Sequence, residues 1–153
     1  MKRASAGWSE VDLQAGVWII PSERMKGDKE HRVPLSDRVL AILSELPRDG
    51  DAVFPGKAAG GFLNQDATAD VLAKLRPGVT VHGFRSTFRT WAEERTNYPR
   101  EVCEQALAHT IGNTVERAYR RGDVLEKRRR LMVEWASYCA APARGEVVPL
   151  RSA

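Results

Sequence analysis

The chain has 153 residues, of which 42% are hydrophobic, and a formal net charge of +4. This composition is that of an ordinary globular domain long enough to bury a core, and it excludes a disordered or fibrous chain. No apolar run approaches the roughly 18 residues needed to span a bilayer, and no apolar region of a signal peptide follows the charged N-terminus, so we expect a cytoplasmic protein.

The first third of the chain predicts a small β-sheet. Residues 8–13 are a candidate strand, and Gly16 is expected in the turn that follows it. Residues 18–21 and 31–35 are short extended-type segments on either side of a polar, glycine-containing stretch, residues 22–30. This pattern is typical of a β-hairpin with a longer loop.

The rest of the chain predicts helices. Ser36 is expected to cap a helix from Asp37 to Leu46, whose apolar side would hold Val39, Leu40, Ile42, Leu43 and Leu46. Further helices are expected from residue 64 or 65 to Leu75, from His82 to Arg95 after a Thr80 cap, from Pro99 to about Ala108, around Tyr119, and from Val124 to Cys139. The fold class is therefore α+β: a mostly helical domain over residues 1–140 with a small antiparallel sheet near the N-terminus, followed by a flexible tail, residues 141–153.

Cys103 and Cys139 are the only cysteines of the chain. They are too few and too far apart for a disulfide scaffold or a metal cluster. We expect two reduced thiols, both packed in the core.

Basic residues are concentrated between residues 116 and 130. This stretch has three acidic residues and seven basic ones, which are Arg117, Arg120, Arg121, Lys127, Arg128, Arg129 and Arg130. A basic patch attracts a phosphate backbone through the release of condensed counterions. A solvated helix face is the simpler interpretation of such a run, and the charges alone leave both open.

His82 and Arg85 are three residues apart at the start of a predicted helix, so they share one face near its N-terminus. Arginine binds phosphate oxygens with two parallel hydrogen bonds, and histidine exchanges protons near neutral pH. Farther along, Tyr119 is a potential nucleophile with Arg120 and Arg121 beside it. Each of these residues taken alone is as readily explained by an ordinary surface or core role.

Several short motifs together resemble the tyrosine recombinase, or phage integrase, family, and are most similar to integrases of satellite phages and genomic islands. The similarity runs from about Trp8 to Tyr138. The motifs are residues 18–21, Arg24-Met25-Lys26, residues 31–36, His82-Gly83-Phe84-Arg85, Leu107-Ala108-His109 and Ala118-Tyr119-Arg120-Arg121. Each is short, but their order along the chain makes the set specific.

The resemblance implies a role for each matching residue. Tyr119 would attack a scissile DNA phosphate and form a 3′-phosphotyrosyl bond, while Arg85 would bind that phosphate. His82 would assist proton transfer from the tyrosine, His109 would donate to a non-bridging oxygen, and Lys26 would protonate the departing 5′ oxygen. Arg24, Arg117, Arg120 and Arg121 would contact the DNA backbone. The resemblance implies bacterial site-specific DNA recombination, double-stranded DNA as the partner, and no cofactor, metal or membrane.

One catalytic residue of the family pattern has no match. By this alignment the first arginine would fall just before Met1, so we expect weak or no cleavage by this chain alone. Loss of one hydrogen-bond donor that stabilises charge in the transition state typically slows the reaction about 10²–10³-fold. A second interpretation therefore remains open, in which the chain is a remnant of an integrase that binds DNA or another protein without catalysis. A third is that the chain is a relative of type IB topoisomerases, whose motifs are less similar to these.

The last predicted helix, with Leu125, Met132, Trp135 and Cys139 at helical spacing, is expected to pack either within the chain or against a second copy.

Overall fold

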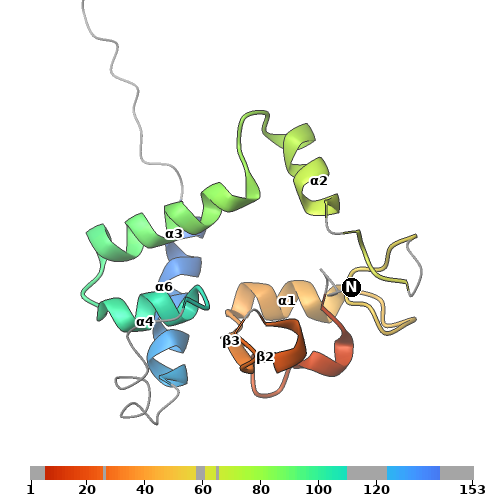
Figure 1. The fold of residues 1–153 in the computed structure, drawn as a ribbon, viewed down its shortest axis with the longest axis horizontal. Helices are drawn as coiled ribbons and strands as arrows, with labels where there is room; N and C mark the ends of the chain where they lie inside the picture. The colour runs from red at the N-terminus through yellow and green to blue at the C-terminus, as the bar shows by residue number, and fades with distance from the viewer. Residues whose placement is uncertain (1–5, 26, 58–60, 65, 110–123, 142–153) are drawn as a thin grey trace, which may run out of the picture.

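The computed structural model describes residues 6–25, 27–57, 61–64, 66–109 and 124–141. It places a small sheet and one covering helix beside a second group of helices (Figure 1). Helix α6 (Leu125–Ala140) belongs to the second group and packs against strand β3 (His31–Pro34), so it joins the two parts. The α+β class predicted from the sequence is confirmed.

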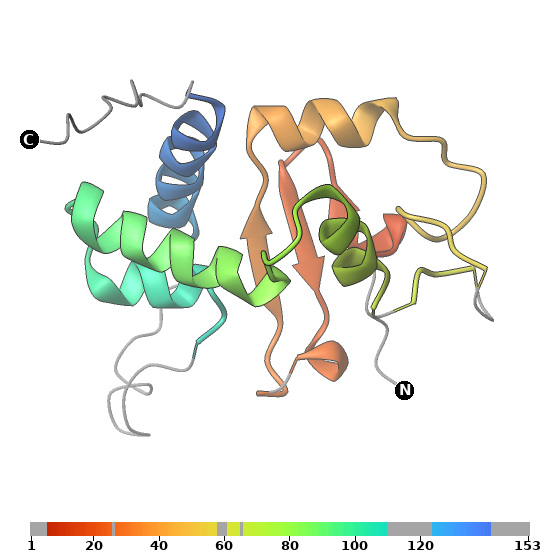
Figure 2. The ribbon, with the colours of Figure 1, turned by 90° about the horizontal axis from the view of Figure 1, so that it is seen from above.

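The sheet has three antiparallel strands in the order β1 (Val11–Asp12), β2 (Val17–Ile20) and β3. The predicted hairpin is formed by β2 and β3 (Figure 2). In its register, Trp18 is paired with Val33. Its loop contains a short 3₁₀ helix, η2 (Ser22–Arg24). Gly16 turns the chain between β1 and β2 with φ +63°, a backbone conformation that favours glycine.

The first predicted strand is only partly correct. Residues Trp8–Glu10 form a 3₁₀ helix, η1, and β1 is confined to the next two residues. The Glu10 carboxylate accepts a hydrogen bond from the backbone N–H of Gly7 at 3.3 Å, which closes a turn at the point where an extended strand was expected. This local hydrogen bond between a side chain and the backbone therefore favours a 3₁₀ helix over the strand that the sequence pattern predicted.

Helix α1 (Asp37–Glu45) begins at the predicted position, after Ser36, although the Ser36 side chain makes no capping hydrogen bond. Of its predicted apolar side, Leu43 is buried, whereas Val39 and Ile42 are 39% and 41% exposed. These two line an apolar groove of about 440 Å³ between α1, the sheet and the residue pairs 53–54 and 63–64.

The remaining helices agree with the sequence prediction to within a few residues. They are α2 (Ala67–Leu75), α3 (Val81–Arg95), α4 (Arg100–Ala106) and α6. Thr80 caps α3 as expected, since its hydroxyl accepts a hydrogen bond from the backbone N–H of Gly83 at 3.1 Å. The predicted helix around Tyr119 and the predicted tail after residue 141 lie outside the described residues.

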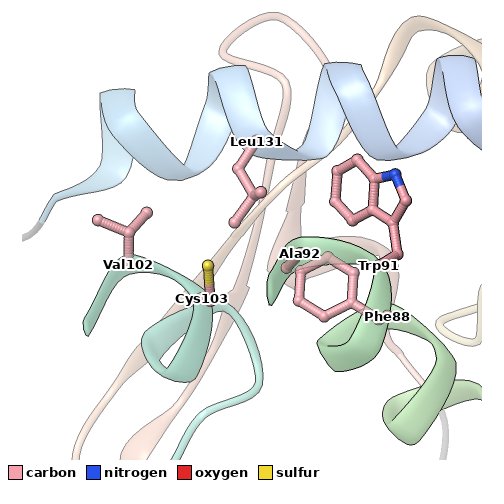
Figure 3. Close-up of a cluster of buried hydrophobic side chains, with 6 residues drawn as sticks. All are labelled: Phe88, Trp91, Ala92, Val102, Cys103 and Leu131. Carbon is pink, nitrogen blue, oxygen red and sulfur yellow. The ribbon is translucent and has the colours of Figure 1, made fainter. Parts of the chain in front are cut away.

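The main core lies between α3, α4 and α6. Its buried side chains come from all three helices and are Phe88, Trp91, Ala92, Val102, Cys103 and Leu131 (Figure 3). Met132 and Trp135 of α6 pack against this cluster within the same chain. This packing holds α3 and α4 in a fixed relation, and these two helices carry the described candidate site residues.

Two sequence expectations about α6 need correction. Cys139 is exposed rather than packed in the core, because it lies in the last turn of α6, where residues 137–140 are all exposed. Arg128 belongs to the basic stretch but is only 3% exposed, and its guanidinium donates a hydrogen bond to the backbone carbonyl of Arg32 in β3. Arg129 donates to the carbonyl of Gly16 at 3.2 Å. These two arginines therefore attach α6 to the sheet, which neither interpretation of the basic stretch anticipated.

Candidate active site

The structure brings together two predicted site residues from different helices. Nη2 of Arg85, on α3, lies 2.6 Å from Nε2 of His109, which follows α4, although 24 residues separate them in sequence. The same Nη2 donates a hydrogen bond to the carbonyl oxygen of Leu107 at 2.7 Å. Both bonds are exposed, so the guanidinium and the imidazole lie at the surface.

The end of α4 explains why His109 lies there. Ala108 has φ +55°, and the backbone N–H groups of Ala108 and His109 donate to the carbonyls of Gln105 and Glu104 at 3.0 and 2.9 Å. This is the hydrogen-bond pattern of a Schellman motif, in which a left-handed residue reverses the chain after a helix. The motif leaves the carbonyl of Leu107 available for a cationic donor, which Arg85 supplies.

Glu104 is a site residue that the sequence analysis missed. Its side chain is buried, and Oε2 lies 2.5 Å from Nδ1 of His109, while Oε1 lies 3.2 Å from Nη2 of Arg89 on α3. The hydrogen bond with His109 is the main cause that lowers the pKa of the Glu104 carboxyl, and it outweighs the opposing effect of burial, with Arg89 contributing further.

A sequence signal for Glu104 does exist. In a Schellman motif the side chain three positions from the helix end contacts the second residue beyond it, and this contact is usually hydrophobic. Here those two positions hold Glu104 and His109, so a hydrogen bond between a carboxylate and an imidazole replaces the hydrophobic contact. This contact could be predicted from the sequence only if the last residue of α4 were already known with an accuracy of one residue.

His82 lies in the first turn of α3, exposed, one helical turn before Arg85. It therefore shares the exposed side of α3 with Arg85 as the spacing predicted. Arg89 lies one turn after Arg85 and is also exposed. This gives α3 one titratable and two cationic side chains in three successive turns, an arrangement suited to an anionic ligand.

Arg24, predicted to contact DNA, is engaged within the chain. Its Nη1 donates to both carboxylate oxygens of Glu10, and the two side chains are only 14% and 13% exposed. Trp18 also donates to Glu10, from Nε1 at 3.1 Å. Burial raises the pKa of Glu10, but the hydrogen bonds from Arg24, Trp18 and Gly7 outweigh it and the pKa is lowered.

The other predicted site residues, Lys26, Arg117, Tyr119, Arg120 and Arg121, lie outside the described residues. Within the described part of the chain, no group of three or more His, Cys, Asp or Glu side chains is placed to hold a metal ion. No described helix is both long and apolar enough to cross a membrane.

Comparison with known proteins identifies the family. The phage integrase family model matches residues 3–126, which is most of the chain and includes every candidate site residue named above. The chain belongs to the phage integrase family. The recombinase resemblance carried by the short motifs is therefore confirmed.

Individual relatives agree with this assignment. The chain is 40% identical to the prophage integrase IntA of Escherichia coli over 151 residues, which cover 95% of the chain and 36% of that protein. It is 32% identical to the integrase of Shigella phage Sf6 over 141 residues, which cover 88% of the chain and 36% of the phage protein. The chain thus spans about a third of the length of these relatives. No solved structure matches it significantly.

Proposed function

We propose that this chain is the catalytic portion of a site-specific DNA recombinase that cleaves and rejoins strands through a 3′-phosphotyrosyl intermediate. The observation that carries the proposal is the contact between Arg85 and His109 at the surface, formed by two motifs far apart in the sequence. A guanidinium and an imidazole held together in this way suit the non-bridging oxygens of one phosphate.

The proposed reaction is a transesterification at phosphorus. The Tyr119 oxygen forms a bond to the scissile phosphorus as the bond from phosphorus to the 5′ oxygen breaks. The phenolic proton passes to His82, acting as a base, and Lys26 protonates the departing 5′ oxygen. Attack by the 5′ hydroxyl of another strand reverses these steps and releases the tyrosine. Arg85 and His109 stabilise the charge on the phosphate oxygens throughout.

The test uses the complete protein that contains these residues, incubated with a suicide DNA substrate that carries its attachment site. We expect a covalent adduct that is lost in Tyr119→Phe and retained in Tyr138→Phe, a matched control at an exposed tyrosine of α6. An adduct that persists in Tyr119→Phe would overturn the assignment of the nucleophile.

Absence of an adduct with the unmodified protein would favour the alternative, a remnant without catalytic activity. A gel-shift series over salt concentration then separates its two forms. Phosphate contacts by the proposed arginines predict an affinity that falls steeply with ionic strength, whereas a protein-interaction remnant would not bind DNA even at low salt.

We also propose that the chain is a monomer or exchanges its last helix between two copies. Met132 and Trp135 pack within the chain, which supports the monomer, while Val133 and Tyr138 on the same helix are about half exposed. Light scattering at two protein concentrations distinguishes the two states, because only a dimer dissociates on dilution.

A further inference from the structure

We propose that Glu104 is a positioning residue of this site: it fixes the ring orientation of His109, and in the free chain also its tautomer, so that Nε2 of the imidazole faces the phosphate position beside Arg85. The inference rests on the proposed function, since it assigns a role within that same site. It is carried by the geometry of four side chains from α3, α4 and the residues that follow α4.

Glu104 is held from two directions. One carboxylate oxygen lies 2.5 Å from Nδ1 of His109, and the other lies 3.2 Å from the guanidinium of Arg89. Its backbone carbonyl accepts the N–H of His109 at 2.9 Å, so main chain and side chain of Glu104 both bind the same histidine. With only 8% of the residue exposed, the carboxylate has little freedom to leave this position.

The proton on the imidazole can be placed from its partners. A guanidinium has only donors, so the contact of 2.6 Å between Arg85 and Nε2 is a hydrogen bond only if Nε2 carries no proton and accepts. The proton of the neutral ring then lies on Nδ1, where Glu104 accepts it. One tautomer therefore satisfies both contacts, and the opposite tautomer breaks both.

This arrangement has a chemical consequence for phosphate binding. Nε2 is the ring nitrogen at the exposed side, next to the guanidinium that would bind the phosphate, while Nδ1 is engaged by Glu104. A carboxylate that holds Nδ1–H orients the imidazole in serine proteases, where replacing that carboxylate by an amide leaves the wrong tautomer and greatly slows the reaction. Glu104 fills the corresponding position here. In the free chain Nε2 accepts from Arg85, whereas donation to a phosphate oxygen requires a proton on Nε2 as well, so the ring on the phosphate is an imidazolium. The Glu104 carboxylate stabilises that cation while it accepts from Nδ1–H.

Replacement of Glu104 by glutamine separates positioning from simple packing. The carboxylate accepts from His109 with one oxygen and from Arg89 with the other, but an amide has a single oxygen. If that oxygen stays with Arg89, the amide NH₂ meets Nδ1 and can only donate to it. Glu104→Gln is therefore expected to move the proton of His109 from Nδ1 to Nε2, and Nε2–H can no longer accept from Arg85.

The experiment is imidazole ¹⁵N NMR of this chain at a pH where histidine is neutral. His109→Gln assigns the signal, and the other two histidines, His31 and His82, serve as internal references. We expect His109 to have a pyrrole-type Nδ1 and a pyridine-type Nε2, with the two exchanged in Glu104→Gln and unchanged in Glu94→Gln, an exposed glutamate of α3. A pyridine-type Nδ1 in the unmodified chain would overturn the proposal, even if the glutamine variant failed to fold.

Adduct formation in the complete protein gives a second readout. Glu104→Gln should slow formation of the Tyr119 adduct by at least about tenfold, because the amide can neither accept from Nδ1–H nor stabilise the imidazolium on the phosphate. A loss of this size is typical when a group that orients a ligating histidine is removed. Glu94→Gln should leave the rate unchanged. An adduct that forms at the normal rate in Glu104→Gln would reject the positioning role and leave the proposed function intact. Failure of the proposed function would appear as no adduct in the unmodified protein, while the NMR result stands on its own.

Discussion

The ring centroids of Trp91 and Trp135 lie 5.0 Å apart, which joins α3 to α6 by direct aromatic contact. Phe88 adds an edge-to-face contact with Trp135, at 5.3 Å and an interplanar angle of 89°. Aromatic pairs in such geometries contribute about 0.5–1.5 kcal/mol beyond the area they bury. Since Phe88 is three residues after Arg85 on α3, this packing determines where the guanidinium is held.

Trp135→Ala should therefore destabilise the fold by about 3 kcal/mol, at the lower end of the range for aromatic truncation because the indole is only partly buried. Urea unfolding followed by circular dichroism measures the change. Val133→Ala is the matched control on the same helix, with its side chain about half exposed, and should change stability by less than about 0.5 kcal/mol. Equal losses in the two variants would contradict the packing described here.

Ala108→Gly should stabilise the protein. Ala108 has φ +55° at the end of α4, where a left-handed conformation costs an L-residue about 1–2 kcal/mol. Glycine adopts this conformation freely but loses more backbone entropy on folding, so the expected net gain is up to about 1 kcal/mol. Thermal unfolding should show a higher Tm, with the imidazole signals of His109 unchanged. A lower Tm would mean that the Ala108 methyl group makes a contact worth more than the strain.

The hydroxyl of Tyr98 donates to Glu134 at 2.7 Å and links the segment after α3 to α6. Burial, together with this hydrogen bond, raises the pKa of Tyr98 to about 12 from its ordinary value of 10.0. Because the folded-state pKa is the higher one, the contribution to stability is complete below pH 10 and is lost as pH rises towards 12.

The test is the pH dependence of thermal unfolding between pH 8 and pH 12. The Tm of the unmodified chain should fall more steeply above pH 10 than the Tm of Tyr98→Phe, which has no phenol to ionise. Tyr138→Phe, at a partly exposed tyrosine of α6, should keep the steeper dependence. Parallel curves for the unmodified chain and Tyr98→Phe would show that this hydrogen bond does not contribute to the pH dependence.

Arg24→Ala should reduce stability at neutral pH, because it leaves the mostly buried Glu10 carboxylate without its guanidinium. The pKa of Glu10 is lowered in the folded chain, so the pair stabilises the fold above the ordinary carboxyl pKa, and this stabilisation is lost as pH falls through the folded-state value. The difference in unfolding free energy between the unmodified chain and Arg24→Ala should therefore shrink on acidification.

Salt-dependent gel shifts with the same variant test whether Arg24 also contacts DNA. A phosphate contact would reduce the slope of log affinity against log salt by about 1 when it is removed. Arg32→Ala, at an exposed arginine in β3, is the control for a general loss of positive charge. An unchanged slope would restrict Arg24 to its structural pairing with Glu10.

Much of the architecture could be predicted from the sequence, because its signals are local. The Thr80 cap, the His82 and Arg85 spacing and the Gly16 turn each depend on hydrogen bonds or steric limits within a few residues. The order of the short motifs also indicated the family, which the family comparison confirmed.

Only the tertiary structure decided which partners these side chains meet. It buried Arg128 against a carbonyl 96 residues away, exposed Cys139 and paired Glu104 with His109. The physical reason is that periodicity sets which face of a helix is apolar, but not its rotation or crossing against other helices. Whether a side chain is buried, and which distant residue it contacts, depends on that packing. At the end of α4, a shift of the helix end by one residue would separate Glu104 from His109.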